Sequence, residues 1–241
     1  MSSLETTAHA ATHTARRLII AIDGPSGAGK STIGRLLARR LGLLYLDTGA
    51  MYRAAALRVI ESNVRLQDET RVAEICHAAH IELEGDPDAI KVNLDGRDVT
   101  HEIRTEQVGH AASVISTNSQ VRRDMVRRQR ELARSGGIVL DGRDIGTVVF
   151  PDADAKFFLT ATPEQRAERR FEQDTHRGAD ANFEDVLRDI NMRDERDANR
   201  DDSPLRIADD AVVLDSTEAT IDEVLGKMIA VVLERQNEKA I

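Results

Sequence analysis

Residues 24–31 read Gly-Pro-Ser-Gly-Ala-Gly-Lys-Ser and bring a lysine and a hydroxyl directly after a glycine-rich turn. Gly24 and Gly29 stand at the two ends of the G-x-x-x-x-G-K-[ST] spacing, which is typical of loops that bind phosphate groups. Glycines let the backbone curl so that its N–H groups point inward at anionic oxygens. The Lys30 ammonium suits the β- and γ-phosphates, and the Ser31 hydroxyl suits Mg²⁺, which prefers oxygen ligands. The segment predicts a nucleoside triphosphate site.

The stretches on either side of this loop are the elements that must hold it. Residues 18–22 form an apolar run that predicts a buried strand, and Asp23 ends the run. After the loop, apolar residues recur at positions 33, 36, 37 and 41, the spacing of one helix face. A dinucleotide-binding loop would need glycine at position 32, where Thr32 stands. The predicted ATP-binding residues are Gly24, Pro25, Ser26, Gly27, Ala28, Gly29, Lys30, Ser31 and Thr32.

Further short apolar runs predict the other strands of the sheet, at residues 43–46, 138–140, 156–159 and 211–214. Asp47, Asp141 and Asp215 directly follow three of them. Ligands bind outside the carboxyl ends of strands in doubly wound sheets, although an acid there is also common turn chemistry. Capping boxes at Thr162 and Thr220 predict two flanking helices. We expect an α/β fold of the P-loop NTPase type, with a doubly wound parallel sheet of about five strands.

Two stretches depart from the alternation of strands and helices. Between residues 80 and 104 the apolar residues alternate with polar ones, and Asp95-Gly96 is a strong hairpin signal, so we expect a small antiparallel insert over about 64–104. Residues of about 166–204 are polar and rich in arginine. A solvated, salt-bridged helix is one interpretation of that charge run. The phosphate loop elsewhere favours the other, a helical lid whose arginines close over a phosphoryl group.

Composition narrows the choice of ligands. The 241 residues carry a net charge of −9, which argues against a surface that binds duplex nucleic acid. No stretch approaches the roughly 18–20 apolar residues that span a bilayer. Cys76 is the single cysteine, which fits a core residue in a reducing cytoplasm. Only five of the 33 basic residues are lysines, and forked arginine side chains suit small phosphorylated ligands.

A phosphate loop alone is compatible with a phosphotransferase, a GTPase switch or a nucleic-acid-dependent ATPase. Guanine-reading switches use Asn/Thr-Lys-x-Asp, and none of the five lysines is followed two residues later by Asp. A motor would need a larger chain or a basic track. A small-molecule kinase remains, and it needs a second anionic-substrate site. Residues 47–53 and 141–151 offer hydroxyl, aromatic, arginine and carboxylate side chains for that site.

Taken together, these segments closely resemble the bacterial cytidylate kinases. The similarity runs from about residue 18 to 232 and is carried by IDGPSGAGKST (22–32), LDTGAMYR (46–53), VRRQR (126–130), LDGRDIGTVVFPDA (140–153), RDERDANR (193–200) and VLDST (213–217). The second and fourth segments are specific to that family, whereas the P-loop is shared by a superfamily. The resemblance implies transfer of the γ-phosphoryl group of ATP to CMP or dCMP, with Mg²⁺.

The resemblance also implies roles for individual residues. The expected catalytic residues are Lys30, Arg143 and Arg200, the latter two as phosphate clamps. The expected substrate residues are Asp47, Thr48, Tyr52 and Arg53 near the monophosphate, Ser113, Arg122 and Asp144 at cytosine, and Arg193 and Asp197 at the ribose. Arg123 lies beside Arg122, and the two could exchange roles. For the metal we expect Ser31 and, through water, Asp141, with turn capping as the alternative for Asp141.

The chemistry of the base agrees with this assignment. Cytosine offers an amino donor at N4 that Asp144 can accept, whereas uracil has a carbonyl there. Direct in-line transfer then needs no phosphoenzyme and no general base.

For the chain as a whole we expect a disordered tail at 1–17 and one kinase domain over 18–241, monomeric and cytoplasmic, with no nucleic-acid or membrane partner. A kinase for UMP or a small metabolite, or a nucleotide-gated binding protein that uses residues 80–104 as its contact surface, are the alternatives.

Overall fold

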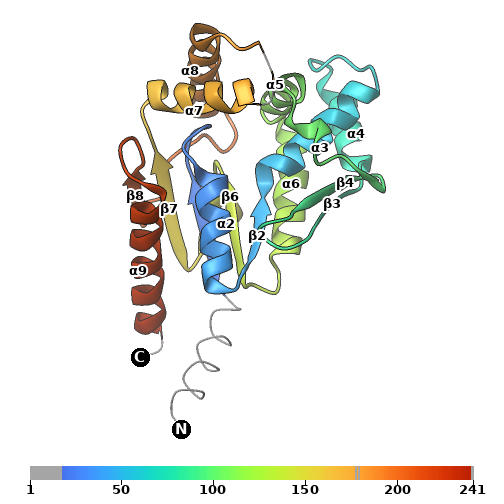
Figure 1. Cartoon of the computed structure of the whole chain (residues 1–241). Coiled ribbons are helices and arrows are strands. Elements are labelled where there is room, and N and C mark those ends of the chain that lie inside the picture. The colour runs from blue at the N-terminus through green and yellow to red at the C-terminus, as the bar shows by residue number, and fades with distance from the viewer. Residues whose placement is uncertain (1–17, 177, 179, 240–241) are drawn as a thin grey trace.

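The computed structural model describes residues 18–176, 178 and 180–239, and its centre is a five-stranded parallel sheet (Figure 1). The predicted tail at 1–17 lies outside the described residues. The strand order is β2-β6-β1-β7-β8, so the sheet is doubly wound as predicted. The strands are β1 (Ile19–Asp23), β2 (Leu44–Asp47), β6 (Ile138–Gly142), β7 (Ala155–Thr160) and β8 (Val212–Asp215).

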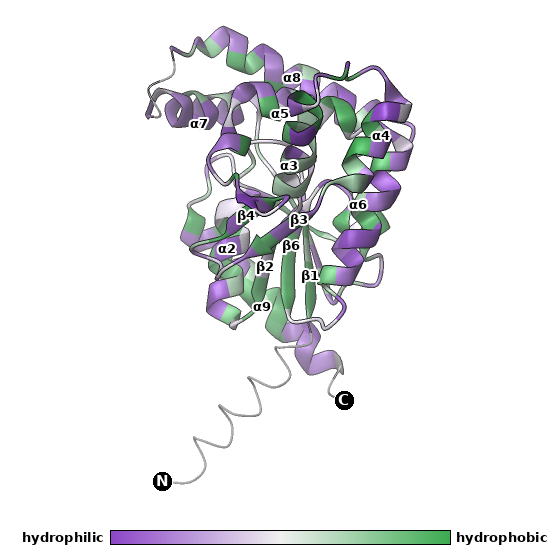
Figure 2. Cartoon of the chain, turned by 90° about the vertical axis from the view of Figure 1, so that its right-hand side faces the viewer, coloured by the Kyte–Doolittle hydropathy of each residue, from purple (hydrophilic) through white to green (hydrophobic). Residues whose placement is uncertain are grey.

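Alternate residues of β1, β2 and β6 enter two separate hydrophobic cores, one on each face of the sheet, whereas β7 and β8 contribute to one of them. Ala21 and Leu140 pack on one face, against α3 (Thr48–Glu61), α5 (Glu106–Ile115) and α6 (Ser119–Leu132). Ile22 and Val139 pack on the other face, against α2 (Lys30–Leu41) and α9 (Ile221–Lys239). Figure 2 shows hydrophobic strands between helices that are polar on their outer sides. This two-sided burial is why the strands read as continuous apolar runs in the sequence.

The register of the sheet aligns the residues that end its strands. Asp47 pairs with Asp141, and Asp23 pairs with Gly142. Because the strands are parallel, the turns that follow β1, β2 and β6 all leave the same edge. The P-loop, the start of α3 and the loop after β6 therefore meet at one place, as the sequence predicted.

A small antiparallel sheet lies beside α3 and α4 (Glu69–Ala78), and its strands are β3 (Ile81–Glu84), β4 (Lys91–Leu94) and β5 (Arg97–Asp98). Asp95 and Gly96 make the turn with φ of 51° and 82°, the left-handed pair that favours a two-residue hairpin. The predicted hairpin is confirmed. The short helix η1 (Glu102–Arg104) then returns the chain to α5.

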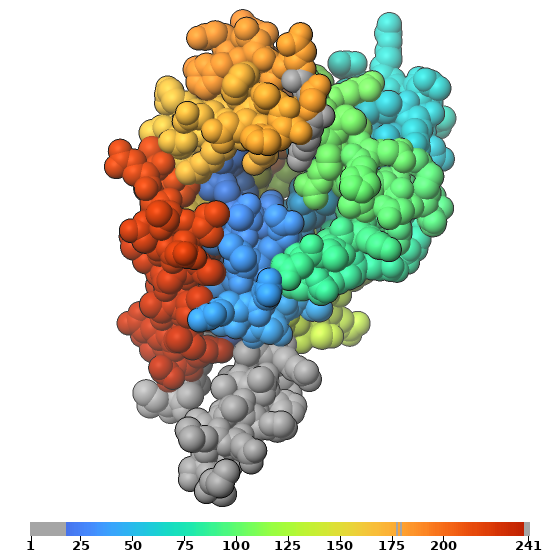
Figure 3. Space-filling view, in the orientation of Figure 1, coloured from blue at the N-terminus to red at the C-terminus, as the bar shows by residue number. Residues whose placement is uncertain are grey.

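Two further helices, α7 (Pro163–His176) and α8 (Phe183–Asn199), lie across the carboxyl edge of the sheet (Figures 1 and 3). Their ends are joined by an edge-to-face contact between Phe171 and Phe183, whose ring centres are 6.3 Å apart. The boxes predicted at Thr162 and Thr220 do open α7 and α9, where each threonine hydroxyl accepts a backbone N–H three residues on. Within the described part of the chain, each helix is too short or too polar to cross a lipid bilayer.

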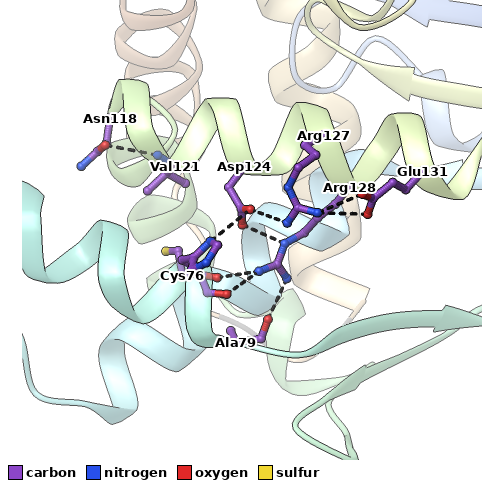
Figure 4. Close-up of polar contacts among 9 residues, drawn as sticks. Cys76, Ala79, Asn118, Val121, Asp124, Arg127, Arg128 and Glu131 are labelled. Carbon is purple, nitrogen blue, oxygen red and sulfur yellow. Dashed lines mark hydrogen bonds and ion pairs between the residues drawn. The ribbon is translucent and has the colours of Figure 1, made fainter.

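Arg128 on α6 holds the end of α4, as Figure 4 shows. Its guanidinium donates to the carbonyl oxygens of Cys76, His77 and Ala79 at 3.2, 2.7 and 2.7 Å. Its Nε also donates to Asp124 at 2.8 Å. The last carbonyls of a helix have no partner within the helix, so this one cation stabilises the point where α4 turns into the small sheet.

Truncation of this side chain tests that role. We expect Arg128→Ala to lower the free energy of unfolding by about 1–3 kcal/mol, because three carbonyls lose a charged donor. Arg127→Ala is the matched control: Arg127 pairs with Asp124 and Glu131 but is half exposed, so its loss should cost clearly less than that of Arg128. Urea unfolding measures both, and equal losses would contradict the assignment.

Candidate active site

The glycine-rich loop has no room for side chains at its first position. Gly24 has φ of 145°, and a Cβ there would lie 2.0 Å from the carbonyl oxygen of Leu159 in β7. Gly29 precedes α2 with φ of 89°, and as a glycine it offers no side-chain cap. The first N–H groups of α2 are thus directed at the loop's concave side, where an anion suits both the donors and the helix dipole.

Lys30 is buried at the start of α2, and its Nζ donates to the carbonyl of Pro25 at 2.6 Å. Burial and the nearby Arg143 guanidinium lower its pKa well below the usual value, and Asp141 opposes that shift. A phosphate oxygen beside Lys30 would favour the charged ammonium, because a negative charge raises the pKa that burial lowers.

Asp141 is the last residue but one of β6. Its Oδ2 accepts from the Ser31 hydroxyl at 2.8 Å, and Tyr45 is a further hydrogen-bonding neighbour of this carboxylate. Burial and the Asp47 charge raise the pKa of Asp141 to about 7.

These two side chains fit Mg²⁺ that is held largely by phosphate oxygens and water. The described residues contain no group of three His, Cys, Asp or Glu side chains that could hold a metal by themselves. The Ser31 hydroxyl and the Oδ1 of Asp141 are oxygen donors on the triphosphate side of the sheet edge, and Mg²⁺ commonly binds through one or two such groups.

Arg122, Asp144 and Tyr52 form a buried cluster on the other side of that edge. Arg122 on α6 makes an ion pair with Asp144, which follows β6, and its guanidinium lies 5.9 Å from the centre of the Tyr52 ring. Arg123 is exposed, so Arg122 is the arginine that faces the site. The Nε of Arg122 is buried without a partner among the described residues, so a donor remains available beside Asp144.

Asp197 on α8 joins the two predicted phosphate clamps. Its Oδ2 accepts from Arg143 Nε at 2.9 Å, and its Oδ1 lies 3.8 Å from Arg200 Nη1. Burial and the Arg143 charge lower the pKa of Arg193 to about 9, although Asp197 opposes them. Arg193 Nε and Arg200 Nη2 are buried and unpaired within the described chain. The Asp197 carboxylate is therefore shared by two guanidiniums, and the unpaired N–H groups could bind a further anion.

The remaining predicted residues lie at the start of α3. Thr48 Oγ1 donates to the Asp141 carbonyl at 2.7 Å, and Asp47 Oδ1 caps α3 by accepting from Ala50 N at 2.9 Å. Arg53 Nη1 donates to the carbonyl of Ile103 at 3.3 Å, and burial lowers its pKa to about 10. In this structure Asp47 thus has a structural bond of its own, and Arg53 borders open space.

That space is a cleft of about 1720 Å³ between the P-loop, α3, α5 and the pair α7–α8. Figure 3 shows α7 and α8 lying over the carboxyl edge of the sheet and reaching toward α5. Predicted site residues that line it are Ser26, Gly27, Ser31, Asp47, Arg53, Ser113 and Arg193. Lys30, Thr48, Arg122, Asp141, Asp144, Asp197 and Arg200 are buried and do not line it.

Three side chains that sequence reasoning left without a role lie at this site. Arg166 on α7 donates to the Ser26 carbonyl at 3.1 Å and pairs with Asp194 through both its terminal nitrogens. Arg196 on α8 donates to the Ser113 hydroxyl at 2.6 Å, and the available signal was its spacing of three residues from Arg193, which puts both on one helix face. Asp23, whose only signal is that it ends β1, is bonded to the loop after β6.

Comparison with known proteins agrees with this geometry. A sequence model of the family described as Cytidylate kinase matches residues 20–234. The chain belongs to the cytidylate kinase family. It is 47% identical over 214 residues to the cytidylate kinase of Bacillus pumilus, covering 89% of this chain and 95% of that one. It is 48% identical over 212 residues to the enzyme of Aeromonas salmonicida, covering 88% and 92%.

The fold is also similar to that of a solved gluconokinase from Sinorhizobium meliloti. The TM-score is 0.50 at 14% sequence identity, and the match covers 93% of this chain and 97% of that one. At this identity the likeness concerns the fold alone.

The raised pKa of Asp141 predicts how stability depends on pH. Between its unfolded pKa of 3.8 and its folded value of about 7, the folded state holds a proton that the unfolded state lacks, so stability falls as pH rises through this window. Asp141→Asn removes that loss. We expect the stability of the variant to fall less than that of the natural protein as pH rises from about 4 to about 8.

Asp215, which ends β8, is the control, because its pKa is shifted in the opposite direction. Hydrogen bonds from Thr217 lower its pKa, so its stabilisation is present near neutral pH and is lost as pH falls. Asp215→Asn should therefore destabilise the protein at about pH 8. Denaturant unfolding without nucleotide and with a chelator measures both variants. An Asp141→Asn curve parallel to that of the natural protein would refute the assignment.

Proposed function

We propose that this chain transfers the γ-phosphoryl group of ATP to CMP or dCMP, giving ADP and CDP or dCDP by direct in-line transfer. Membership of the cytidylate kinase family supports the reaction. The observation that carries the proposal is the set of buried N–H groups of Arg122, Arg193 and Arg200, which have no partner among the described residues; Arg193 also lines the cleft that the P-loop borders. Buried guanidinium donors are costly to leave unpaired, so an anionic, hydrogen-bonding ligand explains them.

The triphosphate lies on residues 24–32, where the glycine backbone and Lys30 bind its oxygens. Ser31, and Asp141 through water, hold Mg²⁺, which when bound neutralises charge on the β- and γ-phosphates. Arg143 and Arg200 lie toward the acceptor and bind the transferring group. CMP is already ionised at neutral pH, so positioning and charge neutralisation account for the step without a general base.

The acceptor occupies the opposite side of the cleft. Asp144 accepts from the cytosine amino group, and Arg122 and Ser113 bind the O2/N3 edge. Thr48, Tyr52 and Arg53, with Asp47, surround the monophosphate. Arg193 and Asp197 bind the ribose.

In this arrangement residues 64–104 form the part that closes on the monophosphate, and residues 166–204 form the lid over the phosphoryl group. Arg166 and Arg196 link the lid to the P-loop and to α5. The enzyme works as a monomer in the cytoplasm, and its partners are the two nucleotides.

Loss of either clamp should slow the chemistry. Arg143→Ala or Arg200→Ala is expected to lower turnover by about 10²–10³, the usual scale for removing a donor that stabilises charge in the transition state. Arg188→Ala is the control, because that arginine lies on the same α8 but is exposed and pairs with Asp185. Steady-state ADP release measures the rates, and near-normal turnover of the clamp variants with an intact fold would remove them from this role.

Selectivity tests the base reader. An ADP-release panel over CMP, dCMP, UMP, AMP and shikimate should show turnover with the cytidine nucleotides. Asp144→Ala should reduce the preference for CMP over UMP by about tenfold or more, because uracil presents a carbonyl instead of an amino donor to the buried Asp144 carboxylate, at a cost of about 1–3 kcal/mol. Arg123→Ala, next to Arg122 but exposed, should keep the preference.

The panel also separates the alternatives. Turnover that depends on UMP or shikimate instead would identify a kinase for another acceptor. ATP binding without turnover on any acceptor would favour a nucleotide-gated binding protein. Unchanged CMP-to-UMP ratios in Asp144→Ala would overturn the role of Asp144 while leaving the reaction intact.

A further inference from the structure

Asp23 is a buried carboxylate at the junction between β1 and the P-loop, and only 4% of the residue is exposed. Its Oδ1 accepts from the backbone N–H of Ile145 at 2.8 Å, and its Oδ2 accepts from that of Gly146 at 2.7 Å. Both oxygens thus bind one short segment that lies more than 120 residues away in sequence. The side chain contributes no ligand to the triphosphate in the arrangement described above.

Ile145 and Gly146, which donate these two N–H groups, are the first two residues of the short helix η2 (Ile145–Val149), which begins directly after Asp144. The Asp144 side chain does not cap this helix, whereas the Asp144 carbonyl accepts from Val148 and Val149 at 2.9 and 3.1 Å. The first donors of a helix need partners from outside it. Asp23 supplies them, and in doing so it fixes the backbone on which Asp144 and Arg143 stand.

The contact between Asp23 and residues 145–146 is tightly packed. A Cβ on Gly146 would lie 3.3 Å from Asp23 Oδ2 and 3.1 Å from Cδ of Lys156. On the other side, Gly24 lies against the carbonyl of Leu159. Burial raises the pKa of Asp23 to about 6 in spite of the two N–H bonds, so a carboxylate here is costly to the fold. What this carboxylate contributes in return is the pair of hydrogen bonds that it accepts from Ile145 and Gly146.

We propose that Asp23 is a positioning residue for acceptor recognition: it sets the loop that carries Arg143 and Asp144 at a fixed distance and orientation from the phosphate loop that follows Asp23 itself. The inference rests on the proposed roles of Arg143 and Asp144. In this scheme one side chain, that of Asp23, sets the positions of Asp144 and Arg143 relative to the triphosphate. Errors in that register weaken recognition of the acceptor more than binding of ATP.

Asp23→Asn tests the proposal, because the amide keeps one acceptor and turns a donor toward the second N–H. We expect kcat/KM for CMP to fall about 10–100-fold and the CMP-to-UMP ratio to shrink, since small misplacements of reacting groups have effects of this size. KM for ATP should change by less than about threefold, because the P-loop donors are untouched. Asp154→Asn is the matched control: Asp154 accepts from Ile19 N at 2.7 Å at the other end of β1, and its loss should leave the CMP-to-UMP ratio unchanged.

Gly146→Ala provides a second route that keeps the carboxylate. The added methyl group presses on Asp23 Oδ2, so the CMP-to-UMP ratio should shrink in the same direction. This variant keeps the test decisive if Asp23→Asn does not fold, which thermal unfolding reports.

A double variant separates the two proposals. If Asp23 acts through Asp144, adding Asp23→Asn to Asp144→Asn should not reduce the CMP-to-UMP ratio further. If both Asp144 variants keep the preference for CMP, the proposed base reader is wrong. If they lose it while folded Asp23→Asn and Gly146→Ala keep it, the positioning role of Asp23 is overturned.

Discussion

The burial of Lys30 beside Asp141, at the edge where parallel strands end, is the interaction on which the rest of the site depends. The register of β1, β2 and β6 brings Asp23, Asp47 and Asp141 to one edge, where their charges would repel one another in a poorly hydrated space. Lys30 offsets part of that repulsion, and arginines from α6, α8 and the loop after β6 offset more. The fold therefore assembles a charge cluster that is close to balance and sensitive to each added anion.

The cluster is costly to the protein itself. Asp23 and Asp141 have raised pKa values, those of Lys30 and Arg193 are lowered, and in each case burial is the largest cause. Well-packed apolar residues would give a more stable edge. An anionic nucleotide relieves the costs at Lys30 and Arg193, whose buried positive charges gain a partner, but not those at Asp23 and Asp141. Strained electrostatics of this kind concentrate at functional sites.

The elements and much of the site could be predicted from sequence because their signals are local. Apolar runs indicated the strands, capping boxes indicated α7 and α9, and helix phase explains why Arg122 faces inward with Met125 and Gln129 while Arg123 does not. What local patterns do not specify is which distant group a polar side chain meets. The bonds from Arg166 to Ser26 and from Asp23 to Ile145 join residues more than 120 positions apart, and only the folded sheet brings them together.

The strand order β2-β6-β1 has a consequence for the order in which this protein can acquire its structure during synthesis. The first two strands to be made are not neighbours, because β6 must be inserted between them. A nascent chain that ends before residue 138 already holds the full glycine-rich motif but not the strand that supports it, and Gly24 additionally waits for β7. The strands that pack around the motif are thus complete only once residue 160 has been made, and a shorter ribosome-bound fragment would hold the motif without them.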